Sequence, residues 1–123
     1  MTMKKFTPAE ANNTLPLAKE IVKDILNKAK ECRISPDSCR NVQEEILSLI
    51  KELEDIGCTY KDWNFDVGLV DFPASDLNGK DILLCWRSDE EIVSWYHGLE
   101  NGYSGRKPIP SEWLEELSSQ KKN

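Results

Sequence analysis

Three side chains that could ligate a metal, Asp71, Cys85 and His97, lie in three successive apolar runs of the 123-residue chain. His97 is the only histidine. If each run is one strand of a sheet, the three residues fall on adjacent strands. A mixed carboxylate, thiolate and imidazole set suits zinc or another transition metal. Asp66 or Glu10 could supply a further oxygen.

The same residues could instead carry acid–base or nucleophilic chemistry. Cys85 with His97 could form a nucleophile–base pair, and Asp71, next to Phe72 and Pro73, would have a raised pKa if it were desolvated. Against this, a cysteine in a Leu-Leu-Cys-Trp run is more often simply buried. No G-x-S-x-G or phosphate-loop motif is present. Whether the protein is an enzyme stays open.

A glycine-rich basic segment, residues 102–107, is a second candidate site. Its backbone N–H groups and the cations Arg106 and Lys107 could bind a phosphate or a carboxylate. Arg87 could join them from the end of the preceding strand. The residues that could stack a planar ligand are Trp86 and Tyr103.

The competing interpretation of this segment is structural. Arg106 would then pair with an acidic residue such as Asp71 or Glu10, and the glycines would only shape a turn. The chain has 22 acidic residues, which makes such a pairing easy to satisfy.

Composition limits the class of protein and of partner. A chain of this length is expected to form one domain, residues 1–123. The formal net charge of −6 argues against nucleic acid as a partner, because binding phosphates needs a clustered excess of Lys and Arg. No apolar run is long enough to span a membrane, and the first ten residues lack the apolar core of a signal peptide. We expect a cytoplasmic protein.

The four cysteines, Cys32, Cys39, Cys58 and Cys85, include no C-x-x-C pair, which disfavours a thiolate zinc site. In an intracellular protein we expect reduced, partly buried thiols. Cys32 and Cys39 could face one another across a helical hairpin, but the sequence does not define their geometry.

Residues 7–57 are expected to form the helical part. Thr7 and Glu10 make a capping box around Pro8, and Pro16 predicts a fresh helix start or a kink. A second helix follows Ser35-Pro36-Asp37 and ends at Gly57. Apolar residues at three- and four-residue steps give each helix one buried stripe. These residues are Leu17, Ile21, Val22, Ile25, Leu26 and Ala29, then Val42, Ile46, Leu49, Ile50, Leu53 and Ile56.

After Gly57 the pattern changes to alternation, which predicts three strands within 67–74, 81–86 and 92–97. Asn78-Gly79 predicts a two-residue turn between the first two strands, and this register places Phe72 opposite Cys85 and Asp71 opposite Trp86. Pro73 indicates that the first strand is an edge strand or ends nearby. The register of the third strand is open by one residue, and a slip of one would turn every side chain to the other face.

The fold class is therefore α+β: a long antiparallel helical hairpin packed with a small three-stranded antiparallel β-meander. Residues 58–110 would hold the sheet and the glycine-rich loop, and residues 111–123 a short helix and tail docked by Trp113, Leu114 and Leu117. Two helices and a small sheet leave apolar surface to cover, so a homo-oligomer is possible.

Several strings of this sequence together are specific to one family. They are Gly68-Leu69-Val70-Asp71-Phe72-Pro73-Ala74, Leu84-Cys85-Trp86-Arg87, His97 with Gly102-Tyr103-x-Gly105-Arg106-x-Pro108, Phe6-Thr7-x-x-Glu10-Ala11-Asn12, Leu15-Pro16, Gly57 and Lys61-Asp62. With these strings the chain resembles a prokaryotic family called domain of unknown function 2203. One departure is that Tyr96 precedes His97, where the family usually has tryptophan. The resemblance implies a small bacterial or archaeal cytoplasmic protein of helices plus a small sheet, and it implies no activity.

Two functional hypotheses follow. The first is a non-enzymatic ligand-binding or interaction module with a site for a small anionic ligand. The second is a metal-dependent or acid–base enzyme centred on Asp71, Cys85 and His97. The sequence identifies neither a cofactor nor the ligand. The ligand-binding residues of the first hypothesis are Asp71, Trp86, Arg87, His97, Tyr103 and Arg106.

Overall fold

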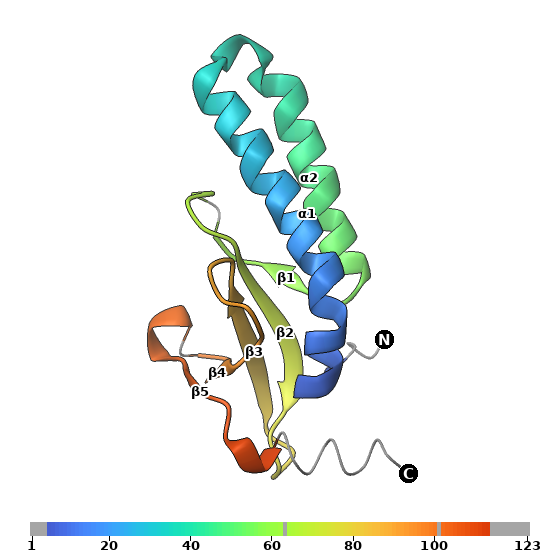
Figure 1. Cartoon of the computed structure of the whole chain (residues 1–123), viewed down its shortest axis with the longest axis vertical. Coiled ribbons are helices and arrows are strands. Elements are labelled where there is room, and N and C mark those ends of the chain that lie inside the picture. Colours follow the sequence, from blue (N-terminus) through green and yellow to red (C-terminus); the bar gives the residue numbers. More distant parts are fainter. Residues whose placement is uncertain (1–4, 63, 101, 114–123) are drawn as a thin grey trace.

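The structure is a computed structural model of the chain and describes residues 5–62, 64–100 and 102–113. A long helical hairpin of α1 (Pro8–Ile34) and α2 (Cys39–Asp55) packs with an antiparallel sheet, and its far half extends beyond the sheet (Figure 1). The strands, in spatial order, are β1 (Thr59–Tyr60), β2 (Leu69–Ser75), β3 (Asp81–Arg87), β4 (Trp95–Gly98) and β5 (Lys107–Pro108).

The α+β class and the helical hairpin are confirmed, but the sheet has five strands and not three. The two additional strands, β1 and β5, are two residues long and close the meander on either side. Two residues are too few to produce an alternating pattern, and Pro108 in β5 has no N–H to donate. Residues 111–113 are helical, and the rest of the expected final helix, with Leu114 and Leu117, lies outside the described residues.

α1 begins with the predicted capping box, in which the Thr7 hydroxyl accepts the Glu10 N–H and the Glu10 carboxylate accepts the Thr7 N–H. The predicted fresh start at Pro16 is wrong, because the helix runs through it. Proline lacks the N–H for the carbonyl of Asn12, yet Leu15 and Ala18 on either side of it are both buried. Burial of one continuous face therefore keeps the helix whole across the proline.

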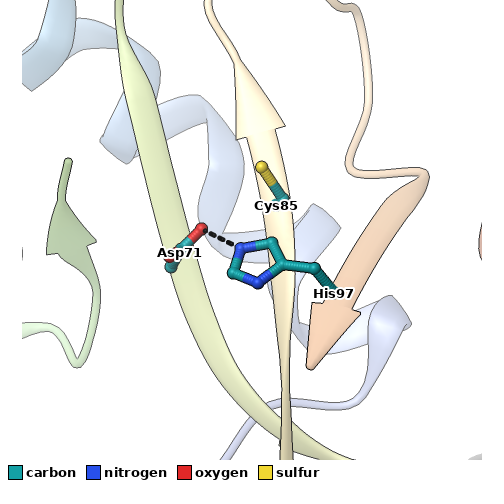
Figure 2. Close-up of side chains that lie close together, drawn as sticks. All are labelled: Asp71, Cys85 and His97. Atoms are coloured by element: carbon teal, nitrogen blue, oxygen red, sulfur yellow. Dashed lines mark hydrogen bonds and ion pairs between the residues drawn. The ribbon is translucent and has the colours of Figure 1, made fainter. Parts of the chain in front are cut away.

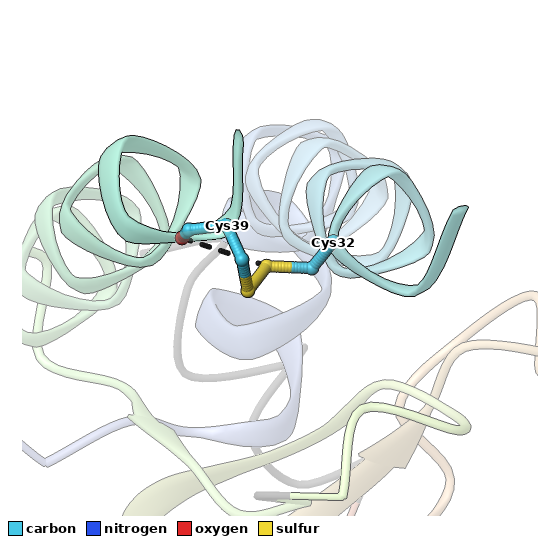
Figure 3. Close-up of a disulfide and its surroundings, with 2 residues drawn as sticks. All are labelled: Cys32 and Cys39. Atoms are coloured by element: carbon cyan, nitrogen blue, oxygen red, sulfur yellow. Dashed lines mark hydrogen bonds between the residues drawn. A yellow bond between two sulfur atoms is a disulfide. The ribbon is translucent and has the colours of Figure 1, made fainter. Parts of the chain in front are cut away.

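The connection between the two helices is closed by a disulfide between Cys32 and Cys39 (Figure 3). A short 3₁₀ turn, Pro36–Ser38, brings the two cysteines together with their Cα atoms 4.6 Å apart. The expectation of reduced thiols is therefore wrong for this pair, because the tight turn gives the two residues bridging geometry. Cys58 and Cys85 are buried thiols that form no disulfide, as expected.

One face of the sheet packs against the near half of the helical hairpin. The side chains on this face come from the residues next to Asp71 and Cys85 in their strands. Val70, Phe72, Leu84 and Trp86 belong to one core cluster with the buried residues of both helices. Phe6, just before α1, packs edge-on against Phe72 with the ring centroids 5.2 Å apart. Because alternate residues of a strand point to opposite faces, Asp71 and Cys85 must point away from the helices.

The turn between β2 and β3 differs from the predicted one by a single residue. The Asp76 carboxylate accepts the N–H groups of Asn78 and Lys80, and the Asp76 N–H donates to the Lys80 carbonyl. This closes a three-residue loop, Leu77 to Gly79, in which only Gly79 has a positive φ, of 83°. The two-residue turn is therefore wrong, because an aspartate side chain that bonds the backbone two residues on favours the longer loop.

The longer turn shifts the register by one residue. Asp71 lies opposite Cys85 and Phe72 opposite Leu84, where the sequence predicted Trp86 and Cys85 as their partners. β2 is an interior strand, but β1 pairs only with Val70 and Asp71 and does not reach Pro73. In β4, His97 lies opposite Leu83 and Trp95 opposite Cys85, which settles the register left open for the third strand.

We expect loss of the disulfide to destabilise the fold. Closing a loop of this length lowers the entropy of the unfolded chain, which corresponds to about 2.5 kcal/mol at 25 °C. The Cys32→Ala/Cys39→Ala double variant should therefore lose about that much free energy of unfolding in urea titrations. Dithiothreitol should shift the wild-type urea midpoint and leave the double variant unchanged. An equal effect of the reductant on both proteins would contradict the cross-link.

Candidate functional site

Asp71, Cys85 and His97 converge on the face of the sheet that points away from the helices (Figure 2). They come from β2, β3 and β4, and the ligand atoms of all three lie within 4.8 Å of one another. All three are buried: Asp71 is 3%, Cys85 1% and His97 4% exposed. The observed register brings them together. Asp71 lies opposite Cys85, and His97 lies opposite Leu83, two positions before Cys85, so all three point to the same face of the sheet.

The hydrogen bonds of His97 define where its protons lie. Its Nδ1 is 2.8 Å from the Gly98 carbonyl oxygen, which can only accept, so Nδ1 carries a proton. Its Nε2 is 3.3 Å from Asp71 Oδ1. Two lone pairs cannot face each other there, so either Nε2 or the carboxyl group must hold one further proton. His97 and Asp71 together therefore hold one proton more than a neutral imidazole and a carboxylate would. A bound cation could take the place of this additional proton.

Burial raises the pKa of the two acidic groups in the cluster. Desolvation raises the pKa of Asp71, while His97 and, more weakly, Lys61 oppose that rise. Desolvation also raises the pKa of the Cys85 thiol to about 12, with a further increase from the Asp71 charge and a decrease from Arg106. A thiol with this pKa is neutral at physiological pH and a poor nucleophile by itself. The cluster thus lacks a ready thiolate, which weakens the nucleophile–base interpretation of Cys85 and His97.

The three side chains form one wall of a cavity of about 280 Å³. Three leucines give it apolar walls, and Lys61 adds a cation. Leu99 and Gly102 belong to the segment that follows β4, so the glycine-rich region contributes to this cavity through its first part. The lining residues are Lys61, Leu69, Asp71, Leu83, Cys85, His97, Leu99 and Gly102.

Arg106 is held in a structural ion pair beside this cluster. Its guanidinium makes two hydrogen bonds to the Glu90 carboxylate, at 3.1 and 2.6 Å, and lies 4.5 Å from the centroid of the Trp95 ring. Glu90 also accepts the Arg87 N–H at 2.8 Å. The pairing expected for Arg106 is present, but Glu90 replaces the suggested Asp71 or Glu10 as its partner. Arg106 still lies close enough to lower the pKa of Cys85.

Trp86 and Arg87, two further residues predicted for an anion site, do not join Asp71 and His97 in the cavity. Trp86 points to the helical side, is 1% exposed, and donates its indole N–H to the Glu90 carbonyl. Arg87 pairs with Asp89 at 3.1 Å at the end of β3. Tyr103 begins a 3₁₀ turn, Tyr103–Gly105, and its side chain lies outside the described part of the structure.

Neither of the two acids suggested as an additional metal ligand reaches the cluster. Asp66 lies 3.4 Å from Arg33 and Glu10 is engaged in the cap of α1. Sequence reasoning missed two residues instead. Lys61 follows a strand too short to predict, and Glu90 lies in a turn whose contacts depend on the register. The only available signal for Lys61 was its place in the family resemblance.

The family model of an uncharacterized conserved protein, DUF2203, matches residues 33–109. The chain belongs to this family. The DUF2203 match covers Asp71, Cys85, His97 and Lys61 and therefore the whole cavity, and it begins after the N-terminal strings of the resemblance. No curated protein and no solved structure shows a significant match to the chain. Among the described residues, no helix is long and apolar enough to cross a membrane.

We expect the cysteines to react in a fixed sequence. Iodoacetamide at pH 8.5 should leave the native, unreduced protein unmodified, because Cys58 and Cys85 are buried and the Cys85 thiol is neutral. In guanidinium chloride without reductant, two thiols should react. After reduction all four cysteines should react. Intact-mass spectrometry counts the additions, and rapid modification of Cys85 in the native protein would contradict the buried site.

Proposed function

We propose that the protein binds a divalent transition metal of the zinc type through Asp71, Cys85 and His97. The observation that supports this is the convergence of three different ligand types, all buried, with their ligand atoms within 4.8 Å of one another. Burial of polar and ionisable groups costs free energy unless they are hydrogen-bonded, paired or bound to a cation, and here a carboxylate, a thiol and an imidazole are buried together. A single metal ion satisfies all three at once.

The arrangement suits tetrahedral coordination. Zinc bonds of 2.0–2.3 Å place neighbouring ligand atoms about 3.3–3.8 Å apart. The distance of 3.3 Å between His97 Nε2 and Asp71 Oδ1 falls in this range, and all three ligand atoms lie within 4.8 Å of one another. His97 already donates its Nδ1 proton to the Gly98 carbonyl, which leaves Nε2 directed at the cluster, as in metal sites where a backbone carbonyl orients the ligand histidine. Small side-chain adjustments would therefore complete the geometry.

The charges also balance. One divalent cation, the Asp71 carboxylate, the Cys85 thiolate and a neutral His97 sum to zero, which favours a site shielded from water. Arg106 beside Cys85 favours the thiolate form, and the Glu90 carboxylate neutralises Arg106 in turn. The ion pair would thus act on the metal through the sulfur, without touching the metal itself.

Three protein ligands leave one coordination position vacant, as in catalytic rather than structural zinc sites. That position would face the cavity, where a bound molecule could be polarised. The metal-centred hypothesis thus has more support than the anion module built from six residues, because Trp86 and Arg87 lie elsewhere. Cytoplasmic location and self-association stay predictions, and whether the protein is an enzyme stays open.

We expect purified protein dialysed against zinc to retain about one ion per chain, measured by inductively coupled plasma mass spectrometry. Cobalt substitution should add a sulfur-to-cobalt charge-transfer band in the near ultraviolet. Cys85→Ser should lose this band, and His97→Gln should weaken binding at least about tenfold. Cys58→Ser is the matched control, since Cys58 is also buried and forms no disulfide but lies outside the cluster. A folded wild-type chain that takes up no zinc or cobalt would refute the proposal.

Acid should weaken metal binding. Metal uptake must displace the Cys85 proton and the proton shared by Asp71 and His97, so protons compete with the metal. Between pH 8 and 6 the apparent cobalt affinity should fall between about tenfold and hundredfold per pH unit, the lower figure if only the thiol proton leaves. Competition titrations against a chelator at each pH measure this slope. An affinity independent of pH would mean that the thiol is not a ligand.

A further inference from the structure

Lys61 faces the same cavity as the proposed metal ligands. Thr59 of β1 lies opposite Asp71, and two positions further along the same pairing the Lys61 N–H donates to the Leu69 carbonyl at 2.8 Å. Because side chains alternate along a strand, Lys61 points to the face that carries Asp71. The side chain is exposed, lines the cavity, and acts on the Asp71 charge from there.

The charge of the cavity favours an anion. With the proposed metal bound, Asp71 and Cys85 cancel the ion, and the Lys61 ammonium leaves a net charge of +1. Among residues 5–62, 64–100 and 102–113, no acidic side chain forms a recorded ion pair with Lys61. A ligand with one negative charge would complete the balance, and a carboxylate has two oxygens that can bind the metal and the ammonium together.

The shape and lining narrow the ligand further. The remaining walls are Leu69, Leu83 and Leu99, which suit an aliphatic group. The volume of about 280 Å³ lies just below the range of about 300–1,000 Å³ typical of drug-sized ligands. A small molecule with a charged head and a short apolar tail fits these properties. A phosphate dianion would leave a surplus negative charge against apolar walls.

We propose that the cavity binds a small aliphatic monocarboxylate, whose oxygens bridge the vacant metal position and the Lys61 ammonium while its tail lies against Leu69, Leu83 and Leu99. This inference rests on the proposed metal site. It assigns the ligand class and a second binding residue, which the three metal ligands alone do not define.

The test titrates butyrate, acetate and inorganic phosphate into the cobalt-loaded protein and follows the visible cobalt spectrum. Butyrate should change the spectrum at lower concentration than acetate, and phosphate should bind more weakly than butyrate. Lys61→Met keeps the apolar stem and removes the charge, so it should bind cobalt as the wild type does and bind butyrate at least about tenfold more weakly. Lys23→Met, on the exposed side of α1, is the matched control and should leave both affinities unchanged.

Each outcome separates the two proposals. If the chain binds no cobalt, both fail together. If it binds cobalt but butyrate leaves the spectrum unchanged, or if Lys61→Met binds butyrate as tightly as the wild type, the carboxylate inference alone is wrong. Tighter binding of phosphate than of butyrate would also overturn it. Circular dichroism of each variant confirms that a loss of binding is not a loss of fold.

Discussion

The Asp76 carboxylate sets the length of the turn between β2 and β3, because it accepts the N–H groups of both Asn78 and Lys80. With this turn, Ser75 lies opposite Asp81, and every later pair of the two strands follows, up to Asp71 opposite Cys85. A turn one residue shorter would slide Asp71 opposite Trp86, so that Asp71 and Cys85 would point to opposite faces of the sheet. The convergence of Asp71, Cys85 and His97 thus depends on the side chain of Asp76, a half-buried turn residue that does not line the cavity.

A second set of contacts fixes β4, and with it His97, relative to the rest of the fold. Asn12 of α1 donates to the Val93 carbonyl and accepts the Val93 N–H, so the segment before β4 is tied to the helix. Glu90 contacts three further residues: its carboxylate accepts hydrogen bonds from Arg106 and from the Arg87 N–H, and its carbonyl accepts the indole proton of Trp86. Ligands held by such supporting contacts keep their geometry better than ligands on free loops.

Sequence patterns predicted the parts of this fold that depend on local chemistry. The capping box of Thr7 and Glu10 and the positive φ of Gly57, 99°, follow from single residues and their neighbours. The predictions that were wrong concern features that depend on competition between local signals or on residues distant in the sequence. Asn78-Gly79 favours a two-residue turn, but the hydrogen bonds to the Asp76 side chain stabilise a longer one, and the Asn-Gly signal alone does not reveal this competition.

In the candidate site, too, local features could be predicted and distant contacts could not. Residue type was enough to single out Asp71, Cys85 and His97, but whether they lie on one face of the sheet depends on the strand register. The register also decides which face of the sheet Trp86 occupies. The partner of Arg106 could not be found from the sequence, because Glu90 lies in a turn 16 positions away among 22 acidic residues. The disulfide needed the exact path of the 3₁₀ turn between Cys32 and Cys39.

The proton shared by His97 and Asp71 has a consequence for how the fold would respond to a metal. Without a metal, the pair and the neutral Cys85 thiol together carry no net charge. The proposed divalent ion would displace two protons and leave the same net charge behind. The net charge of the buried cluster would therefore be the same with and without the metal. No change in charge would then drive a rearrangement of the neighbouring strands. In this chain the fold would form without the metal, and the ion could bind and leave without refolding of the protein. A zinc finger differs, because its polypeptide does not fold without the ion.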